Sequence, residues 1–264
     1  MEGAEGGRVR ATIWTSRPPS EGKPGFPAEG VVHLWSWLLT VEEQKLSELE
    51  ETLSDDEWRR VRRFRSHCVA RNFISRRGMM RQILGRYLDQ RPHEIRFRYG
   101  PQGKPSLDQS HEPPLSFNLS DSAELAVLAV CCGSPIGVDV ERIRPCFEAA
   151  EIAGVGHAGS GIGQAVAHPH LGNADAFFRS WTEKEAVAKG KGSGLQFHSA
   201  APTSRPTAPC RRPPDIHLEE GPDAWQVYPL PLPPGYVGSL AASLDVEAII
   251  CFPCSPDLTP ASMP

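Results

Sequence analysis

The residues best suited to catalysis lie in two short acidic motifs. The first, Gly-Val-Asp-Val-Glu at 137–141, follows an apolar stretch and is predicted to form a β-strand. Because residues two apart in a strand point the same way, Asp139 and Glu141 would present two carboxylates on one face. Carboxylates grouped in this way are typical ligands of Mg²⁺.

The second motif, Trp-Thr-Glu-Lys-Glu-Ala-Val-Ala-Lys-Gly at 181–190, is predicted to be helical. With about 3.6 residues per turn, Trp181, Glu185 and Lys189 share one side of this helix. Glu185 would then add a third carboxylate to the two from the strand. Lys189 would face a phosphate held by the same ion, whereas Trp181 is expected to anchor the helix by packing.

Structural interpretations of both motifs stay open at this point. The strand carboxylates would also fit the solvated face of an edge strand. Thr182-x-x-Glu185 is a capping-box pattern, in which Glu185 would only cap a helix. Glu185 and Lys189 would also fit a surface ion pair that contributes about 0.3–0.5 kcal/mol. These interpretations must hold for both motifs independently, and the co-occurrence of the motifs argues against them.

The pair of motifs, in this order and at this spacing, resembles the signature of the 4′-phosphopantetheinyl transferases, in particular the two-lobed surfactin-type class. A third stretch agrees, namely Phe-Asn-Leu-Ser at 117–120, which is preceded by Gly-Lys-Pro at 103–105. The resemblance covers roughly 31–195, with a weaker echo over 225–243, and it thins between Cys146 and Ala174.

This resemblance implies an enzyme that transfers 4′-phosphopantetheine from coenzyme A to a serine of an apo acyl or peptidyl carrier protein and releases adenosine 3′,5′-bisphosphate. Asp139, Glu141 and Glu185 would hold Mg²⁺, with Mn²⁺ as the alternative ion. Glu185 would be a ligand, the base that takes the serine proton, or both. Glu185 and Lys189 are the predicted catalytic residues. The sequence does not name the carrier, which would belong to fatty-acid, polyketide or nonribosomal-peptide synthesis.

The resemblance also implies residues that bind the cofactor. Lys104 would lie near the nucleotide, and Ser120 would donate to a phosphate oxygen. Arg60 and Arg71 fall close to positions at which the family uses basic residues for the 3′-phosphate. Lys184 would face either the pyrophosphate or solvent.

One residue departs from the family pattern. The family has Ser-His-Ser where this chain has Ser-Asp-Ser at 120–122, and that histidine commonly helps to hold the 3′-phosphate. An aspartate would repel a phosphate by roughly 1 kcal/mol or more if partly buried. Asp121 would therefore turn away, orient a nearby arginine, or mark a tolerance for cofactors without the 3′-phosphate; we favour the second interpretation.

Local signals predict the elements that position these residues. Capping-box patterns at Thr40 and Ser54 open two helical regions, and Pro92 ends the second. The Gly- and His-rich stretch 148–172 is expected to be irregular. The remaining expected elements are strands at 31–39, 94–99, 116–119, 124–131, 136–141, 225–229, 236–243 and 246–252, and a helix at 175–189.

We therefore expect an α+β fold, built as a pseudo-twofold pair of lobes that each pack a small antiparallel sheet with helices, with the active site in the cleft between them. Residues 1–30 are expected to be disordered. Residues 31–133 would form the nucleotide-binding lobe, 134–254 the lobe with the metal and catalytic motifs, and 255–264 a loose tail. Since one chain supplies both lobes, a monomer would suffice.

Composition indicates the cellular compartment that we expect. The chain has 264 residues, is 39% hydrophobic and carries a net charge of −4, without an apolar run as long as a membrane span or a signal region. Seven cysteines, an odd number without a regular framework, indicate reduced thiols. We expect a cytoplasmic protein with no membrane partner.

Positive charge is concentrated in one segment. From Arg59 to Lys104 there are 13 arginines and one lysine against only Asp89 and Glu94. Such a field attracts polyanions, so an alternative is a nucleic-acid-binding module built on 59–98, although that would leave the acidic motifs without a role and we expect no nucleic-acid partner. A second alternative is an inactive relative that only docks a carrier protein.

Overall fold

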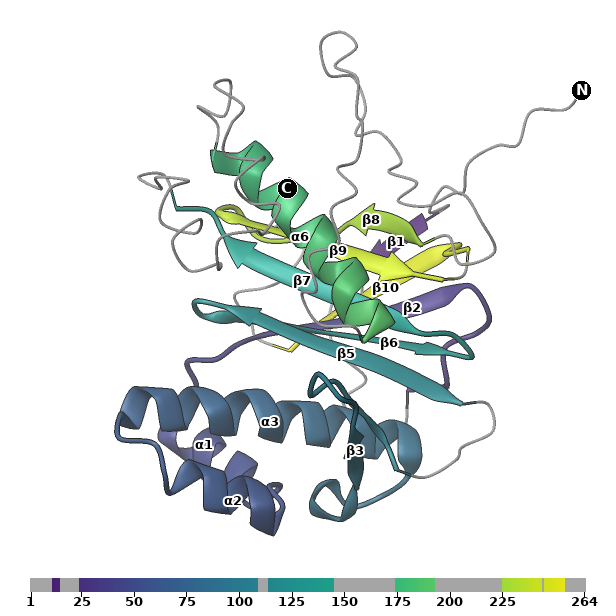
Figure 1. Cartoon of the computed structure of the whole chain (residues 1–264). Helices are drawn as coiled ribbons and strands as arrows, with labels where there is room; N and C mark the ends of the chain where they lie inside the picture. Colours follow the sequence, from purple (N-terminus) through teal and green to yellow (C-terminus); the bar gives the residue numbers. More distant parts are fainter. Residues whose placement is uncertain are drawn as a thin grey trace, which may run out of the picture.

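Two β-sheets lie between two helical layers in the computed structural model, which describes residues 11–14, 24–108, 114–144, 174–192, 225–243 and 245–254 (Figure 1). Helices α1, α2 and α3 cover the outer face of a five-stranded sheet. A three-stranded sheet packs on the other face of that sheet, and α6 covers the three-stranded sheet from outside. The fold is thus α+β with two lobes, as the sequence predicts.

The first helical layer contains α1 (Glu43–Glu50), α2 (Asp55–Val61) and α3 (His67–Leu88), followed by the short 3₁₀ helix η1 (Pro92–Glu94). The capping box predicted at Ser54 is confirmed, since the Ser54 backbone N–H donates to Glu57 Oε2 at 3.2 Å. The box predicted at Thr40 is wrong, because α1 has Glu42 as its N-cap and no side-chain capping bond. Arg62 to Ser66 divide the second predicted helical region into α2 and α3.

The five-stranded sheet has the order β1-β10-β2-β6-β5. Strands β2, β6 and β5 are antiparallel, whereas β10 runs parallel to both β1 and β2. A separate hairpin pairs β3 with β4. The strands are β1 (Ala11–Trp14), β2 (Val31–Leu38), β3 (Phe97–Tyr99), β4 (Pro105–Leu107), β5 (Leu115–Ser122), β6 (Leu125–Cys132) and β10 (Ala248–Pro253).

The three-stranded sheet is antiparallel in the order β7-β9-β8, formed by β7 (Ile136–Arg142), β9 (Tyr236–Ala242) and β8 (Gln226–Pro229). Helix α6 (Ala174–Lys191) lies across β7 and β9. Each strand of a half-buried sheet alternates its side chains between two faces. One face of this sheet therefore packs toward the first sheet and the other toward α6.

Two strands lie where the sequence did not place them. Strand β10, expected to close the second lobe, instead hydrogen-bonds to β2 in the first sheet. Strand β1 lies inside the segment 1–30, for which disorder was expected, and gains backbone hydrogen bonds at the free edge of β10. The irregular stretch predicted at 148–172 and the tail 255–264 lie outside the described residues.

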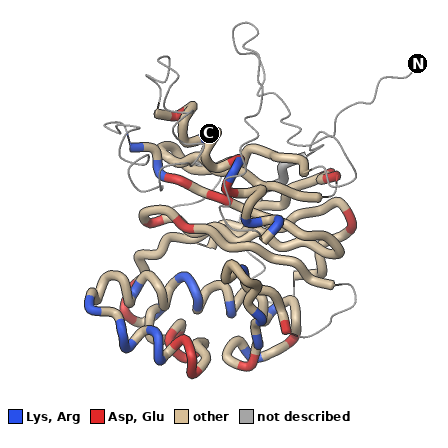
Figure 2. The backbone as a smooth tube through the Cα atoms, in the orientation of Figure 1, with Lys and Arg blue, Asp and Glu red and all other residues tan. Residues whose placement is uncertain are grey.

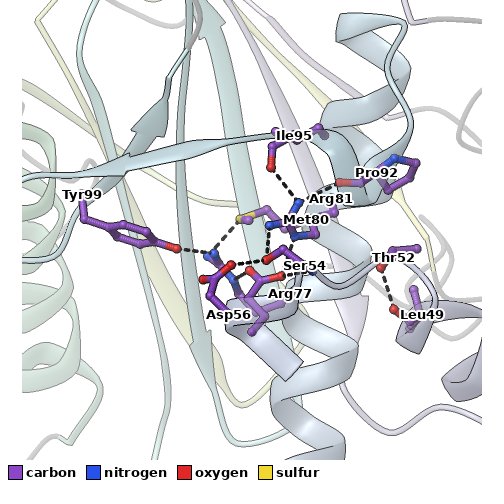
Figure 3. Close-up of polar contacts among 11 residues, drawn as sticks. Leu49, Thr52, Ser54, Asp56, Arg77, Met80, Arg81, Pro92, Ile95 and Tyr99 are labelled. Atoms are coloured by element: carbon purple, nitrogen blue, oxygen red, sulfur yellow. Dashed lines mark hydrogen bonds and ion pairs between the residues drawn. The ribbon is translucent and has the colours of Figure 1, made fainter. Parts of the chain in front are cut away.

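A buried ion network fixes the first helical layer (Figure 3). Glu57 of α2 is 3% exposed and accepts from Arg77 Nε and Arg81 Nε of α3, both at 2.6 Å. Arg81 also donates to the carbonyls of Pro92 and Ile95, at 2.7 and 2.9 Å. Buried charges persist only when they are paired and hydrogen-bonded in this way, so the network locks α2, α3 and the following turn together.

Candidate functional site

A ladder of side chains joins the two sheets where β5 meets β7. Asn118 Oδ1, Ser120 Oγ and Ser122 Oγ of β5 accept the backbone N–H groups of Val138, Val140 and Arg142, at 2.8, 3.3 and 3.1 Å. In each of these pairs the β7 residue lies 20 positions after its β5 partner, so β5 and β7 run parallel. Because polar residues two apart on β5 meet alternate N–H groups of β7, this ladder sets the register of the strand that carries the acidic motif.

Two glycines let α6 approach the sheet closely. A Cβ at Gly137 of β7 would lie 1.9 Å from the Ala186 carbonyl oxygen and 2.4 Å from the Gly190 nitrogen. A Cβ at Gly190 would lie 2.2 Å from the Trp225 ring. No side chain larger than hydrogen fits at either position with α6 where it is. This contact places the 181–190 motif of α6 over β7.

Asp139 and Lys189 meet across this contact. Lys189 Nζ donates to Asp139 Oδ1 at 2.6 Å and to Ser120 Oγ at 2.9 Å, while Ser120 Oγ donates to Asp139 Oδ1 at 3.0 Å. Asp139 is 4% exposed, and its Oδ2 is buried without a hydrogen-bond partner among the described residues. Burial raises the pKa of Asp139, while the Lys189 ammonium opposes that shift.

Glu141 follows two residues later on the same strand. Its Oε2 accepts from Ser122 Oγ at 2.6 Å. Burial raises its pKa, the Ser122 hydrogen bond lowers it, and the nearby Asp139 charge raises it further. The prediction that the two β7 carboxylates share one face is confirmed by their contacts with successive serines of β5.

Glu185 reaches the same region from α6. Burial, followed by the charge of Asp139, raises its pKa to about 7, with a smaller contribution from Glu141. The capping interpretation of Glu185 is wrong, because Thr182 lies inside α6 and its hydroxyl contacts the Arg179 carbonyl and Ser239 Oγ. Trp181 stacks on Phe177 with the rings 6.4 Å apart, consistent with a packing role.

The three carboxylates influence one another electrostatically without forming a finished metal cage. Within the described residues, no group of three His, Cys, Asp or Glu side chains is arranged to hold a metal ion. Lys189 is instead the cation next to Asp139. The arrangement can thus neutralise a carboxylate with an ammonium, while one buried carboxylate oxygen accepts no hydrogen bond from the residues that the structure describes.

Comparisons with known proteins show the family to which the chain belongs. Residues 36–133 match the family described as 4′-phosphopantetheinyl transferase, N-terminal. Over 165 residues the chain is 39% identical to the 4′-phosphopantetheinyl transferase HetI of Nostoc sp., which covers 62% of this chain and 70% of that protein. This chain belongs to the 4′-phosphopantetheinyl transferase family.

Two further relatives of this transferase align with the chain over different lengths. It is 27% identical over 213 residues to the 4′-phosphopantetheinyl transferase psf-1 of Bacillus pumilus, covering 79% of this chain and 88% of that protein. It is 30% identical over 135 residues to AcpT of Salmonella typhi, covering 50% and 68%. The chain is an enzyme of this family. Within its described part, no helix combines the length and apolar character needed to cross a membrane.

The residues predicted to bind the cofactor are dispersed in this transferase. Lys104 Nζ donates to the carbonyls of Ile136 and Gly190, at 3.0 and 2.7 Å, and burial lowers its pKa to about 8. Arg71 donates to the Glu43 carboxylate and, at 3.0 Å, to the Val41 carbonyl. These contacts tie both side chains to neighbouring elements, so their roles toward a cofactor stay predictions.

Two more of the five predicted cofactor residues, Arg60 and Lys184, lie on exposed helix faces. Arg60 of α2 stands over the Phe73 ring at 5.2 Å from its centroid. It also lines an open hollow with Asp56, Arg59, Arg63 and Phe64. Lys184 is exposed on α6. Only Ser120, of the five predicted cofactor residues, contacts Asp139 and Lys189 directly.

Asp121 is paired with an arginine, as the favoured interpretation of the sequence states. Arg76 Nη1 of α3 donates to Asp121 Oδ1 at 2.8 Å. Arg76 also lies 5.8 Å from the centroid of Phe73, the ring that Arg60 covers. Sequence reasoning missed Arg76, Asn118 and Ser122. The alternation of Asn118, Ser120 and Ser122 along β5 is the signal that would have identified the last two.

Proposed function

We propose that this chain transfers the 4′-phosphopantetheine group of coenzyme A to a serine of an apo acyl or peptidyl carrier protein, with Mg²⁺ and release of adenosine 3′,5′-bisphosphate. The observation that carries the proposal is the meeting of the β7 and α6 motifs, with Lys189 Nζ 2.6 Å from Asp139 Oδ1 and Glu185 within electrostatic reach. Membership in the transferase family supports the same reaction.

The donor chemistry of the site suits a hard divalent ion. All three candidate ligands, Asp139, Glu141 and Glu185, are carboxylates, and Asp139 Oδ2 is a buried oxygen that has no hydrogen-bond partner in the part of the chain that the structure describes. Such oxygens are the ligands that Mg²⁺ prefers, and Mn²⁺ is the alternative. When bound, the ion would act as a Lewis acid and template for the pyrophosphate.

The side chains around the ion would stabilise charge and accept the proton. Lys189 carries a positive charge at the junction of β7 and α6, where it would stabilise negative charge on the pyrophosphate. Without a bound ion, burial raises the pKa of Glu185 to about 7. Glu185 would be a ligand of the ion, the base that takes the proton of the attacking serine hydroxyl, or both. Ser120 would donate to a phosphate oxygen, and Lys184 would contribute charge from the exposed face of α6.

We further propose that residues 31–133 bind the nucleotide, through Lys104, Arg60 and Arg71, and that 134–254 carry the metal and catalytic motifs, with the reaction in a cleft between the lobes. The pairing of β10 with β2 adds the last strand of the second region to the first sheet. The protein would act as a cytoplasmic monomer. Its carrier would belong to fatty-acid, polyketide or nonribosomal-peptide synthesis.

The test is mass spectrometry of an apo carrier protein incubated with coenzyme A, Mg²⁺ and this protein. The expected result is a mass gain equal to one phosphopantetheinyl group. Asp139→Ala and Glu185→Ala are expected to abolish the gain while circular dichroism shows the fold intact. Asp175→Asn removes a half-buried carboxylate of α6 that is paired with Arg179, and is expected to retain the gain. No gain with any apo carrier would overturn the proposal.

The nucleic-acid alternative has less support. Figure 2 shows Lys and Arg along α2 and α3, but acidic residues lie among them. Several arginines of the segment already have carboxylate partners, because Arg77 and Arg81 share Glu57 and Arg76 pairs with Asp121. Tight, steeply salt-dependent binding in a filter assay without Mg²⁺ would favour that alternative.

A further inference from the structure

Two serines of β5 repeat one arrangement with two carboxylates of β7. Ser120 Oγ accepts the Val140 N–H at 3.3 Å and donates to Asp139 Oδ1 at 3.0 Å. Two residues on, Ser122 Oγ accepts the Arg142 N–H at 3.1 Å and donates to Glu141 Oε2 at 2.6 Å. In both cases the serine hydroxyl donates to a carboxylate and accepts from the backbone N–H of the residue that follows the acidic residue.

Each serine hydroxyl has one hydrogen and two lone pairs. Because the Arg142 N–H occupies a lone pair of Ser122 Oγ, the hydroxyl position is fixed relative to the β7 backbone. Its single hydrogen is then directed at Glu141. A glutamate side chain otherwise samples several rotamers, and ordering a long polar side chain costs up to about 2 kcal/mol of conformational entropy.

We propose that Ser122 is a positioning residue that orients Glu141 for divalent-ion binding; this inference rests on the proposed function. Ser120 holds Asp139 in the same way, but it also accepts from Lys189, so a change there would alter this third contact as well. Ser122 has no such contact with Lys189, and it isolates the effect of orienting one carboxylate. Hydrogen-bond partners of ligating carboxylates typically contribute about 10- to 100-fold in metal affinity.

The experiment titrates the full-length protein with Mn²⁺ alone, without coenzyme A or carrier, and follows the electron paramagnetic resonance signal of free Mn²⁺. Ser122→Thr and Ser122→Val are compared, because threonine and valine have nearly the same shape and both suit a strand, while only threonine keeps the hydroxyl. Ser116→Ala is the control, since Ser116 points to the same face of β5 and makes no side-chain hydrogen bond among the described residues.

Ser122→Val is expected to weaken Mn²⁺ binding about 10- to 100-fold, whereas Ser122→Thr and Ser116→Ala stay within about twofold of the unaltered protein. Equal dissociation constants for the Val and Thr variants would overturn the inference and leave the proposed function standing. If the unaltered protein binds no Mn²⁺, both the inference and the metal part of the proposed function fail. Absence of carrier modification with Mn²⁺ binding intact would overturn the proposed transfer alone.

Discussion

Gly137 is the residue at which the packing of α6 can be tested most directly. In Gly137→Ala the new Cβ would lie 1.9 Å from the Ala186 carbonyl oxygen, whereas real Cβ contacts essentially never fall below 3.0 Å. The obstructing atoms belong to the backbone of α6 and cannot rotate away. The helix must therefore move from β7 by at least about 1 Å, the difference between these two distances.

Such a shift acts on the site because Asp139 follows Gly137 by two residues and Lys189 precedes Gly190. Their contact at 2.6 Å would be lost. A misplacement of about 1 Å at a catalytic centre costs about 100-fold in rate, and overpacking costs about 1–3 kcal/mol of stability. We expect both losses together in Gly137→Ala.

The assay is the single-turnover rate of carrier modification at saturating coenzyme A, together with thermal unfolding of the same preparation. Gly25→Ala is the control, because a Cβ at Gly25 would meet no atom within 4 Å and needs no positive φ. A Gly137→Ala protein with the rate and midpoint of the control would refute the argument that the close approach of α6 to β7 builds the site.

Three further predictions concern other ionisable groups. Glu57→Gln leaves two buried guanidiniums without their shared carboxylate, so we expect urea denaturation to show a loss of about 3–5 kcal/mol; a loss below 1 kcal/mol would contradict this. Burial lowers the pKa of His33 to about 4 from 6.5. As the pH falls, the unfolded chain therefore binds a proton at His33 before the folded chain does. Between pH 6.5 and 4 the unaltered protein should lose about 3 kcal/mol more of its free energy of unfolding than His33→Gln does; equal losses in the two proteins would contradict this prediction. Asp121→His removes a negative charge beside Arg76, and we expect a severalfold lower apparent KM for coenzyme A; an unchanged or raised KM would rule this out.

Local periodicity was enough to predict much of the site. The alternation of β7 puts Asp139 and Glu141 on one face, and the turn of α6 puts Glu185 and Lys189 on one side, because these directions depend only on backbone geometry. The capping box at Ser54 is equally local, since its two partners lie three residues apart. The α+β class followed from the order of such elements.

Contacts between distant segments were not predictable in this way. Nothing in the sequence near Lys104 indicates that its ammonium would bind the carbonyl of Gly190 at 2.7 Å. The sequence near Val246 to Phe252 likewise does not indicate that this strand joins β2 rather than β9. Strand partners are chosen by the packing of whole faces, and a short apolar run fits several sheets equally well.

The sequence by itself determined which groups are available for chemistry: three carboxylates, an ammonium on the same helix as one of them, and the family signature that they form. The tertiary structure alone decided that Lys189 rests on Asp139, that Ser122 holds Glu141 and that Arg76 neutralises Asp121. The physical reason is the separation along the chain. Side-chain direction is fixed by neighbouring backbone, whereas a contact across 19 to 50 residues exists only once the sheets and α6 have packed.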